Sequence, residues 1–263
     1  MPKDGTAKVE RLDEAVAATD PVLVVGLGRG HGGKSTALAE IAWRALSQGR
    51  GVIVADGDVR SRSLAGLFPE HVTAPETEEL PDFKTWFSGL LNRMVKERRS
   101  AVLDLGGGDR VLQEYGRDLD LVGFCAKRGI KPLALYVLGP EEEDLRHVLA
   151  IWRSGYFRPD RALLLLNEGV IRQGKTVMGA FDATMSHPGF AEMIQGGAKP
   201  ILLQRLACMA DVRQAGTGFY GASMGEVGSG GIALDPVSEY MTESWLSDLE
   251  AKRVSVGAAE WLP

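Results

Sequence analysis

The hydrophobic positions of this chain follow two alternating patterns. Short continuous apolar runs are typical of strands buried on both faces of a sheet, and they occur at 21–25, 51–55, 101–105, 133–138, 162–166 and 200–203. Apolar residues spaced three and four apart are typical of amphipathic helices, and they occur between the runs at 34–48, 83–99, 110–127, 141–153 and 190–194. The alternation predicts an α/β fold with a mostly parallel sheet flanked by helices on both faces.

Four segments lie outside this alternation. Residues 1–20 are polar and alanine-rich and are expected to form a lead-in, and residues 71–81 are expected to form a surface insertion. Residues 216–231 hold seven glycines, which predicts a mobile loop over 216–235. An amphipathic helix over 236–249 and a tail to residue 263 follow. Since no repeat or linker interrupts the pattern, one domain over 1–263 is expected.

Composition narrows the class of protein. The net charge is −5, which is unlike a strongly basic nucleic-acid binder, and Cys125 and Cys208 are isolated in apolar surroundings. The first residues lack the apolar stretch of a signal peptide, and no apolar run is long enough to span a bilayer, so we expect a cytoplasmic protein without a membrane partner. Glycine is over-represented, with 33 residues.

Many of these glycines lie directly after the first predicted strand, in a motif of the form GxxxxGK[ST]. Glycines in such a loop let backbone N–H groups surround phosphate oxygens at the start of the following helix. Lys34 is expected to contact the β- and γ-phosphates of a nucleotide, and the Ser35 hydroxyl is expected to ligate Mg²⁺. The residues expected to bind the nucleotide are Gly28, Arg29, Gly30, His31, Gly32, Gly33, Lys34, Ser35 and Thr36. The same glycines also fit a dinucleotide-binding fingerprint, which leaves an NAD-type site as an alternative.

Acidic residues follow two of the other predicted strands. Asp104 ends the strand at 101–105, where a phosphate-loop protein needs a carboxylate for Mg²⁺. Asp56 and Asp58 follow the strand at 51–55 and are candidates for a further Mg²⁺ contact and for orienting the attacking water. Gly107 completes a D-x-x-G sequence that is expected to meet the γ-phosphate.

These motifs together resemble those of the ParA/MinD-type ATPases, whose deviant Walker A motif is KGGxGK[ST][ST]. Residues 29–36 resemble that motif, the Asp56–Asp58 pair resembles switch I, and Asp104 resembles the Walker B aspartate. The layout is similar over about residues 21–215. The resemblance implies a P-loop NTPase fold and an ATPase that works as a molecular switch in plasmid partitioning, conjugal transfer or intracellular positioning.

The resemblance also implies roles for single residues. Asp58 would orient the hydrolytic water, Asn167 would contact the adenine, and residues 205–216 would close over the base. ATP would hold two copies together as a homodimer that engages a protein partner. Arg29 stands where the family has a lysine that reaches the other copy's nucleotide, and as arginine it keeps the charge. His31 replaces a glycine, and Gly106–Gly108 replaces a segment that usually contains proline.

Several alternatives stay open at this stage. A P-loop kinase or ligase for a small metabolite would use the same loop, and so would a nucleotide-binding scaffold without turnover. The sequence after the strand at 162–166 lacks a guanine-recognition motif, which favours ATP over GTP. The cluster of Lys96, Arg98 and Arg99 leaves non-specific DNA binding open. The acidic helix at 236–249 argues against a membrane anchor, and its apolar residues are expected to pack on the domain or on a protein partner.

Overall fold

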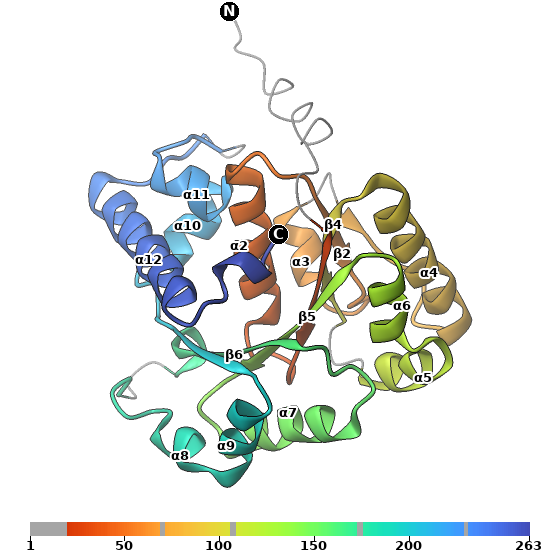
Figure 1. The fold of residues 1–263 in the computed structure, drawn as a ribbon. Coiled ribbons are helices and arrows are strands. Elements are labelled where there is room, and N and C mark those ends of the chain that lie inside the picture. The colour runs from red at the N-terminus through yellow and green to blue at the C-terminus, as the bar shows by residue number, and fades with distance from the viewer. Residues whose placement is uncertain (1–19, 69–71, 106–108, 173–175, 229–230) are drawn as a thin grey trace, which may run out of the picture.

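The computed structural model describes residues 20–68, 72–105, 109–172, 176–228 and 231–263 (Figure 1). In these ranges seven strands form one sheet with every pairing parallel. The strands are β1 (Val22–Leu27), β2 (Val52–Asp56), β3 (Val72–Thr73), β4 (Ser100–Asp104), β5 (Lys131–Leu138), β6 (Arg161–Asn167) and β7 (Lys199–Leu203). The predicted α/β class with a parallel sheet is confirmed.

The strand order is β3-β2-β4-β1-β5-β6-β7, which places β1 in the middle of the sheet. β1 pairs with β4 on one side and with β5 on the other. Because all strands run the same way, the carboxyl ends of β1, β2, β4 and β6 meet at one edge of the sheet. This edge therefore collects the residues that follow each strand.

Helices cover both faces of the sheet (Figure 1). One face carries α2 (Lys34–Ser47), α3 (Ser63–Leu67), α10 (Met209–Ala215), α11 (Gly218–Ser223) and α12 (Pro236–Ser255). The opposite face carries α4 (Leu80–Glu97), α5 (Asp109–Leu119), α6 (Leu121–Lys127), α7 (Glu142–Ser154), α8 (Asp182–Ser186) and α9 (Pro188–Gln195). The short helices η1 (Glu168–Val170) and η2 (Ala259–Trp261) complete the described elements. Alternate residues of β1 enter the two cores, with Leu23 and Val25 on one face and Val22 and Val24 on the other.

Three details of the sequence-based prediction are wrong. The expected insertion at 71–81 contributes strand β3 at the edge of the sheet and the start of α4. The single helix expected at 110–127 is two helices, because Asp120 adopts a left-handed conformation with φ of 47° and caps α6 through Gly123 N. The short helices α3 and α8 were not predicted, since five residues leave too little periodicity to detect.

The prediction of a loop over 216–235 is wrong for residues 218–223, which form α11. The glycines there allow close packing. A Cβ atom at Gly218 would lie 2.4 Å from the Trp43 ring on α2, and one at Gly228 would lie 1.7 Å from the carbonyl oxygen of Ala215. Residues 229–230 of this segment, and the expected lead-in at 1–19, lie outside the described residues.

The C-terminal helix α12 is held on α2 by buried charges. Arg253 pairs with Glu40, and both side chains are almost fully buried. Arg44 donates to both carboxylate oxygens of Glu250 at 2.8 and 2.6 Å. Of the apolar α12 residues expected to pack, Trp245 and Leu249 are buried, whereas Tyr240 and Met241 are exposed. Among the described residues, no helix combines the length and the apolar character needed to cross a bilayer.

Candidate functional site

The loop between β1 and α2 has a backbone path that requires glycine at two positions. Gly28 has a φ of 138°, and a Cβ atom there would lie 2.4 Å from the carbonyl oxygen of Val137. Gly33 has a φ of 89°, and its Cβ would lie 2.2 Å from Asn167 Nδ2. Both conformations disfavour residues with a side chain. The motif glycines therefore determine the shape of the loop.

The N-terminus of α2 is arranged to receive an anion. Gly33 occupies the N-cap position and offers no side-chain cap, and the first turn contains no acidic residue. By contrast, Asp120 caps α6 and Asp235 caps α12. The N–H groups of a first helical turn have no acceptor within the helix, and the helix dipole adds positive potential. An uncapped helix of 14 residues behind a glycine loop is the arrangement that binds phosphate.

Lys34 lies across this loop. Its ammonium group donates to the carbonyl oxygens of Gly28 at 3.0 Å and Arg29 at 2.9 Å, and the residue is only 6% exposed. A buried ammonium needs such partners, because burial without them is costly. The contacts hold the charge at the mouth of the loop, and the contact of Lys34 with phosphate stays a prediction.

A second cluster joins α2 to the carboxyl ends of β2 and β4. Ser35 Oγ donates to Asp104 Oδ2 at 2.5 Å. Asp56 and Asp104 are paired neighbours in the β2–β4 register, and both are buried. The structure thus brings together Ser35, Asp56 and Asp104, the three residues predicted to contact Mg²⁺. Hydroxyl and carboxylate oxygens are the ligands that Mg²⁺ prefers, and it uses few of them when phosphates supply the others.

Asp56 also organises the segment that follows β2. Its carboxylate accepts hydrogen bonds from the N–H of Ala65 on α3 at 2.7 Å and from the N–H of Asp58 at 3.0 Å. Burial raises the pKa of the Asp56 carboxyl; the two backbone hydrogen bonds oppose this, and the charges of Asp104 and Asp58 add to it. A cation beside these carboxylates would relieve their repulsion. This fits a site for Mg²⁺, although no group of three or more His, Cys, Asp or Glu in the described ranges could hold a metal alone.

Asp58 is partly exposed next to this cluster. Its Oδ1 accepts from the N–H of Ser61 at 3.0 Å, which fixes the turn between β2 and α3. The other predicted contact of this region, Gly107, lies outside the described residues. The roles of Asp58 and Gly107 toward a γ-phosphate stay predictions.

Arg29 and His31 form the outer side of the loop. The Arg29 side chain is 46% exposed and pairs with Asp144 at the start of α7, with 3.3 Å between Nη1 and Oδ1. His31 is exposed and has a φ of 62°, which is unusual for a residue with a side chain. The sequence analysis missed Asp144, although the run of acids at the start of the helix at 141–153 was a signal for a residue facing the loop.

Asn167 and Thr36 connect the loop to β6 and α10. Asn167 Nδ2 donates to the carbonyl oxygen of Gly32 at 2.9 Å, while its Oδ1 accepts from Gly169 N. Arg213 on α10 donates to Thr36 Oγ1 at 3.3 Å, so the segment expected to close over a base lies beside the loop. In this structure Asn167 supports the loop, and a contact with adenine stays a prediction.

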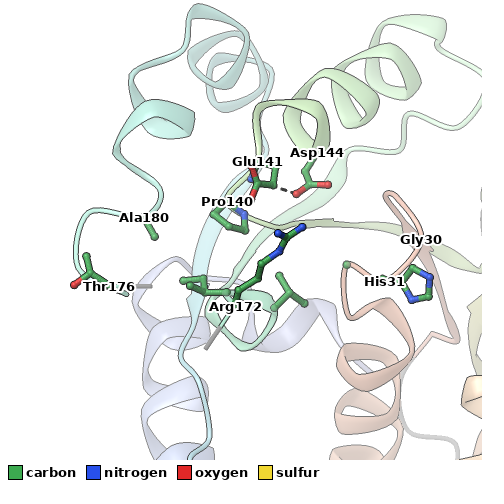
Figure 2. Close-up of a pocket in the computed structure, with 11 residues that line it drawn as sticks. Gly30, His31, Pro140, Glu141, Asp144, Arg172, Thr176 and Ala180 are labelled. Atoms are coloured by element: carbon green, nitrogen blue, oxygen red, sulfur yellow. Dashed lines mark hydrogen bonds between the residues drawn. The ribbon is translucent and has the colours of Figure 1, made fainter. Parts of the chain in front are cut away.

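A pocket of about 490 Å³ opens next to the tip of the loop (Figure 2). It is lined by Gly30, His31, Gly32, Pro140, Glu141, Asp144, Val170, Ile171, Arg172, Thr176 and Ala180. Figure 2 shows the Arg172 side chain extending toward Pro140 and Asp144. Asp56, Asp58 and Asp104 do not line it, so this pocket and the carboxylate cluster are separate regions beside the loop. Residues 173–175, between Arg172 and Thr176 of this lining, lie outside the described residues.

Comparison with known proteins gives similarity in structure only. No protein-family model and no curated protein matches the sequence. The MinC:MinD cell division protein complex of Aquifex aeolicus is similar over 86% of this chain and 94% of that chain, at 13% identity and a TM-score of 0.49.

Two further structures have similar scores. Chloroplast FtsY of Physcomitrella patens matches 93% of this chain and 72% of its own, at 15% identity and a TM-score of 0.48. The cell division protein FtsY of Thermotoga maritima matches 93% and 78%, at 15% identity and a TM-score of 0.48. Such values assign no activity. Independently of these values, the parallel sheet and the GxxxxGKS loop between its central strand and α2 make this a P-loop NTPase fold.

Proposed function

We propose that this protein is a cytoplasmic ATPase that binds ATP with Mg²⁺ at the loop 28–36 and works as a nucleotide-driven switch. One observation supports the proposal: the hydrogen bond from Ser35 to Asp104 joins two oxygens of the type that Mg²⁺ prefers, beside an uncapped helix N-terminus and Lys34. Bound Mg²⁺ would neutralise phosphate charge and orient the phosphate oxygens.

The residues of the chain would then act as follows. Backbone N–H groups of the loop and the Lys34 ammonium would bind phosphate oxygens, and Ser35, Asp104 and Asp56 would hold the metal directly or through water. Asp58 would orient a water molecule for attack on the γ-phosphate. Because Asp56 holds the N–H groups of Asp58 and Ala65, a change at the phosphate end would move the segment that leads to α3.

We further propose that ATP brings two copies together and that Arg29 contacts the nucleotide of the second copy. The support is the exposure of Arg29 at the tip of the loop and its long ion pair with Asp144, which a phosphate could replace at small cost. The process that the ParA/MinD resemblance implies is plasmid partitioning, conjugal transfer or intracellular positioning. A protein partner would bind the ATP-bound form.

Solution mass with different nucleotides tests this proposal. Light scattering should give a monomer with ADP and a dimer with ATP, and the Asp58→Ala variant should stay dimeric with ATP because its hydrolysis is slowed by about 10²-fold or more. Unchanged hydrolysis in Asp58→Ala would overturn the assignment of the water-orienting residue. A monomer under all three conditions would overturn the dimer. Tight GTP binding with weak ATP binding would overturn the choice of base.

A further inference from the structure

The region around α11 and the start of α12 has an unusual charge composition. Residues 214–251 contain six Asp or Glu residues and no Lys, Arg or His. Within them, Glu239 and Glu243 lie on α12, and Asp235 caps this helix. Hydrogen bonds from the Ser238 side chain and from backbone N–H groups hold the pKa of the Asp235 carboxyl below its usual range, so it stays charged. Asp248 and Glu250 pair with Lys252 and Arg44, so the acidic part of this surface is the start of α12.

The same region exposes large apolar side chains. Val237, Tyr240 and Met241 are 63%, 70% and 42% exposed, and their spacing of three and four residues puts them on one face of α12. The face that is buried against the domain adjoins this one, with Trp245 and Leu249 one and two turns after Met241. An amphipathic helix normally exposes polar residues on its outer face, so three exposed apolar residues there need an explanation.

The preceding segment also exposes apolar side chains. Met224 and Val227 are 66% and 64% exposed. The two segments are neighbours, because a Cβ atom at Gly225 would lie 2.7 Å from Glu239 Oε1. We call Met224, Val227, Val237, Tyr240 and Met241, with the carboxylates of Asp235, Glu239 and Glu243, the acidic-apolar surface.

We propose that the acidic-apolar surface docks an amphipathic helix of a protein partner, one that carries Lys or Arg beside its apolar stripe. The apolar residues would cover the stripe, and the carboxylates at the rim would pair with the basic residues. Anionic lipid and nucleic acid carry the wrong charge for this surface. A second copy placed face to face would bring the same carboxylates together, which is unfavourable. Complementarity of charge therefore selects a basic helical partner.

The surface is also connected to the phosphate loop. α11 packs on α2 through Gly218 and Trp43, and α2 begins at Lys34. The inference itself does not need a bound nucleotide, and it is tested without one. Its failure would leave the proposed ATPase untouched.

Fluorescence anisotropy with labelled synthetic peptides tests the inference on the full chain. The probe is a short amphipathic peptide of Leu and Lys, compared with the same peptide carrying Glu for Lys and with a scrambled Leu/Lys peptide. Only the amphipathic Lys peptide is expected to bind saturably. The double variant Tyr240→Ser with Met241→Ser should weaken that binding by about tenfold or more, as for loss of a central apolar contact.

Matched variants distinguish peptide binding at the acidic-apolar surface from non-specific attraction of a basic peptide to an acidic protein. Val254→Ser removes a residue of α12 that is also 63% exposed but lies in the last turn, and it should leave binding unchanged. Glu239→Gln with Glu243→Gln should weaken binding and reduce its dependence on salt, whereas Glu142→Gln with Glu143→Gln on α7 should not. All these side chains lie on the surface, and circular dichroism would check that each variant keeps its fold.

Four outcomes would overturn the inference. The first is equal binding of the Glu peptide or the scrambled peptide, and the second is peptide binding that the Tyr240→Ser/Met241→Ser variant leaves unchanged. The third is saturable binding of phosphatidylserine vesicles that this double variant abolishes. The fourth is a nucleotide-independent dimer that the double variant dissociates. The last two would identify a membrane or a second copy as the occupant.

Discussion

Ser35 Oγ and Asp104 Oδ2 lie 2.5 Å apart, which joins the first turn of α2 to the end of β4. The two residues are far apart in sequence and come from different elements. Their contact places a hydroxyl and a buried carboxylate next to Lys34, where the β- and γ-phosphates of a nucleotide would meet Mg²⁺.

The first prediction concerns this pair. Replacing Ser35 with Ala should weaken the Mg²⁺-dependent part of ATP binding by about 10- to 100-fold, because a direct ligand is lost. Titration calorimetry with Mg²⁺ and with EDTA measures it. Ser47→Ala removes a hydroxyl at the far end of α2 and is the control. It should change neither the affinity for ATP with Mg²⁺ nor the affinity for ATP with EDTA. Equal loss of affinity in EDTA would contradict the metal role.

The second prediction concerns the ion pair between Arg29 and Asp144. Arg29→Ala should lower ATP turnover by about 10³-fold if the guanidinium stabilises transferred phosphate, as in other phosphoryl-transfer enzymes. Affinity for ATP should change little, since Arg29 lies at the tip of the loop. Asp144→Asn should leave turnover unchanged or raise it, because it releases Arg29. Equal turnover of Arg29→Ala and wild type would remove Arg29 from the mechanism.

The buried pair of Arg253 and Glu40 gives a prediction about stability. Arg253→Met leaves the Glu40 carboxylate buried without its main partner, so the free energy of unfolding should fall by about 3–5 kcal/mol. Adding Glu40→Met should recover much of this loss, because it removes the unpaired charge. Urea unfolding measures all three proteins. A double variant as unstable as Arg253→Met would show that packing, rather than the unpaired charge, causes the loss.

Gly218 gives a prediction about packing. Gly218→Ala combines a left-handed φ of 71° with a Cβ atom 2.4 Å from Trp43, and should lower the free energy of unfolding by about 2–4 kcal/mol. Gly231→Ala is the matched control, because Gly231 has a φ of 70° and no atom of the described residues lies within 4 Å of the added Cβ. It should cost only about 1–2 kcal/mol. Thermal unfolding of both variants separates backbone strain from the clash.

Cys125 gives a prediction about pH. Burial raises the pKa of its thiol to about 12, whereas an unfolded chain ionises its thiols near pH 8.5. The unfolded state therefore loses this proton first, and the free energy of unfolding should fall as the pH rises above about 8.5. Cys125→Ala should reduce this slope. In the native protein at pH 8, iodoacetamide should leave Cys125 unmodified, as mass spectrometry would show.

Much of the architecture could be predicted because the signals are local. Apolar runs such as 133–138 predict the buried strands, and the glycines before Lys34 predict a loop between a strand and a helix, which β1 and α2 confirm. The loop predicted at 216–235 failed for a different reason. Glycine content by itself predicts flexibility, whereas Gly218 and Gly228 allow the close approach of their segment to Trp43 and Ala215.

The longer strands and helices, the glycine loop before Lys34 and the carboxylates that follow β2 and β4 could be predicted from local sequence, because backbone preference and burial act over a few neighbouring residues. Other relationships come from packing: Ser35 contacts Asp104, Asp144 pairs with Arg29, and Arg253 pairs with Glu40. The exposure of Tyr240 and Met241 on α12 also depends on this packing. These relationships join residues distant in the chain. Which residues meet depends on how the helices pack on the sheet, and the spacing of residues along the sequence does not give that packing.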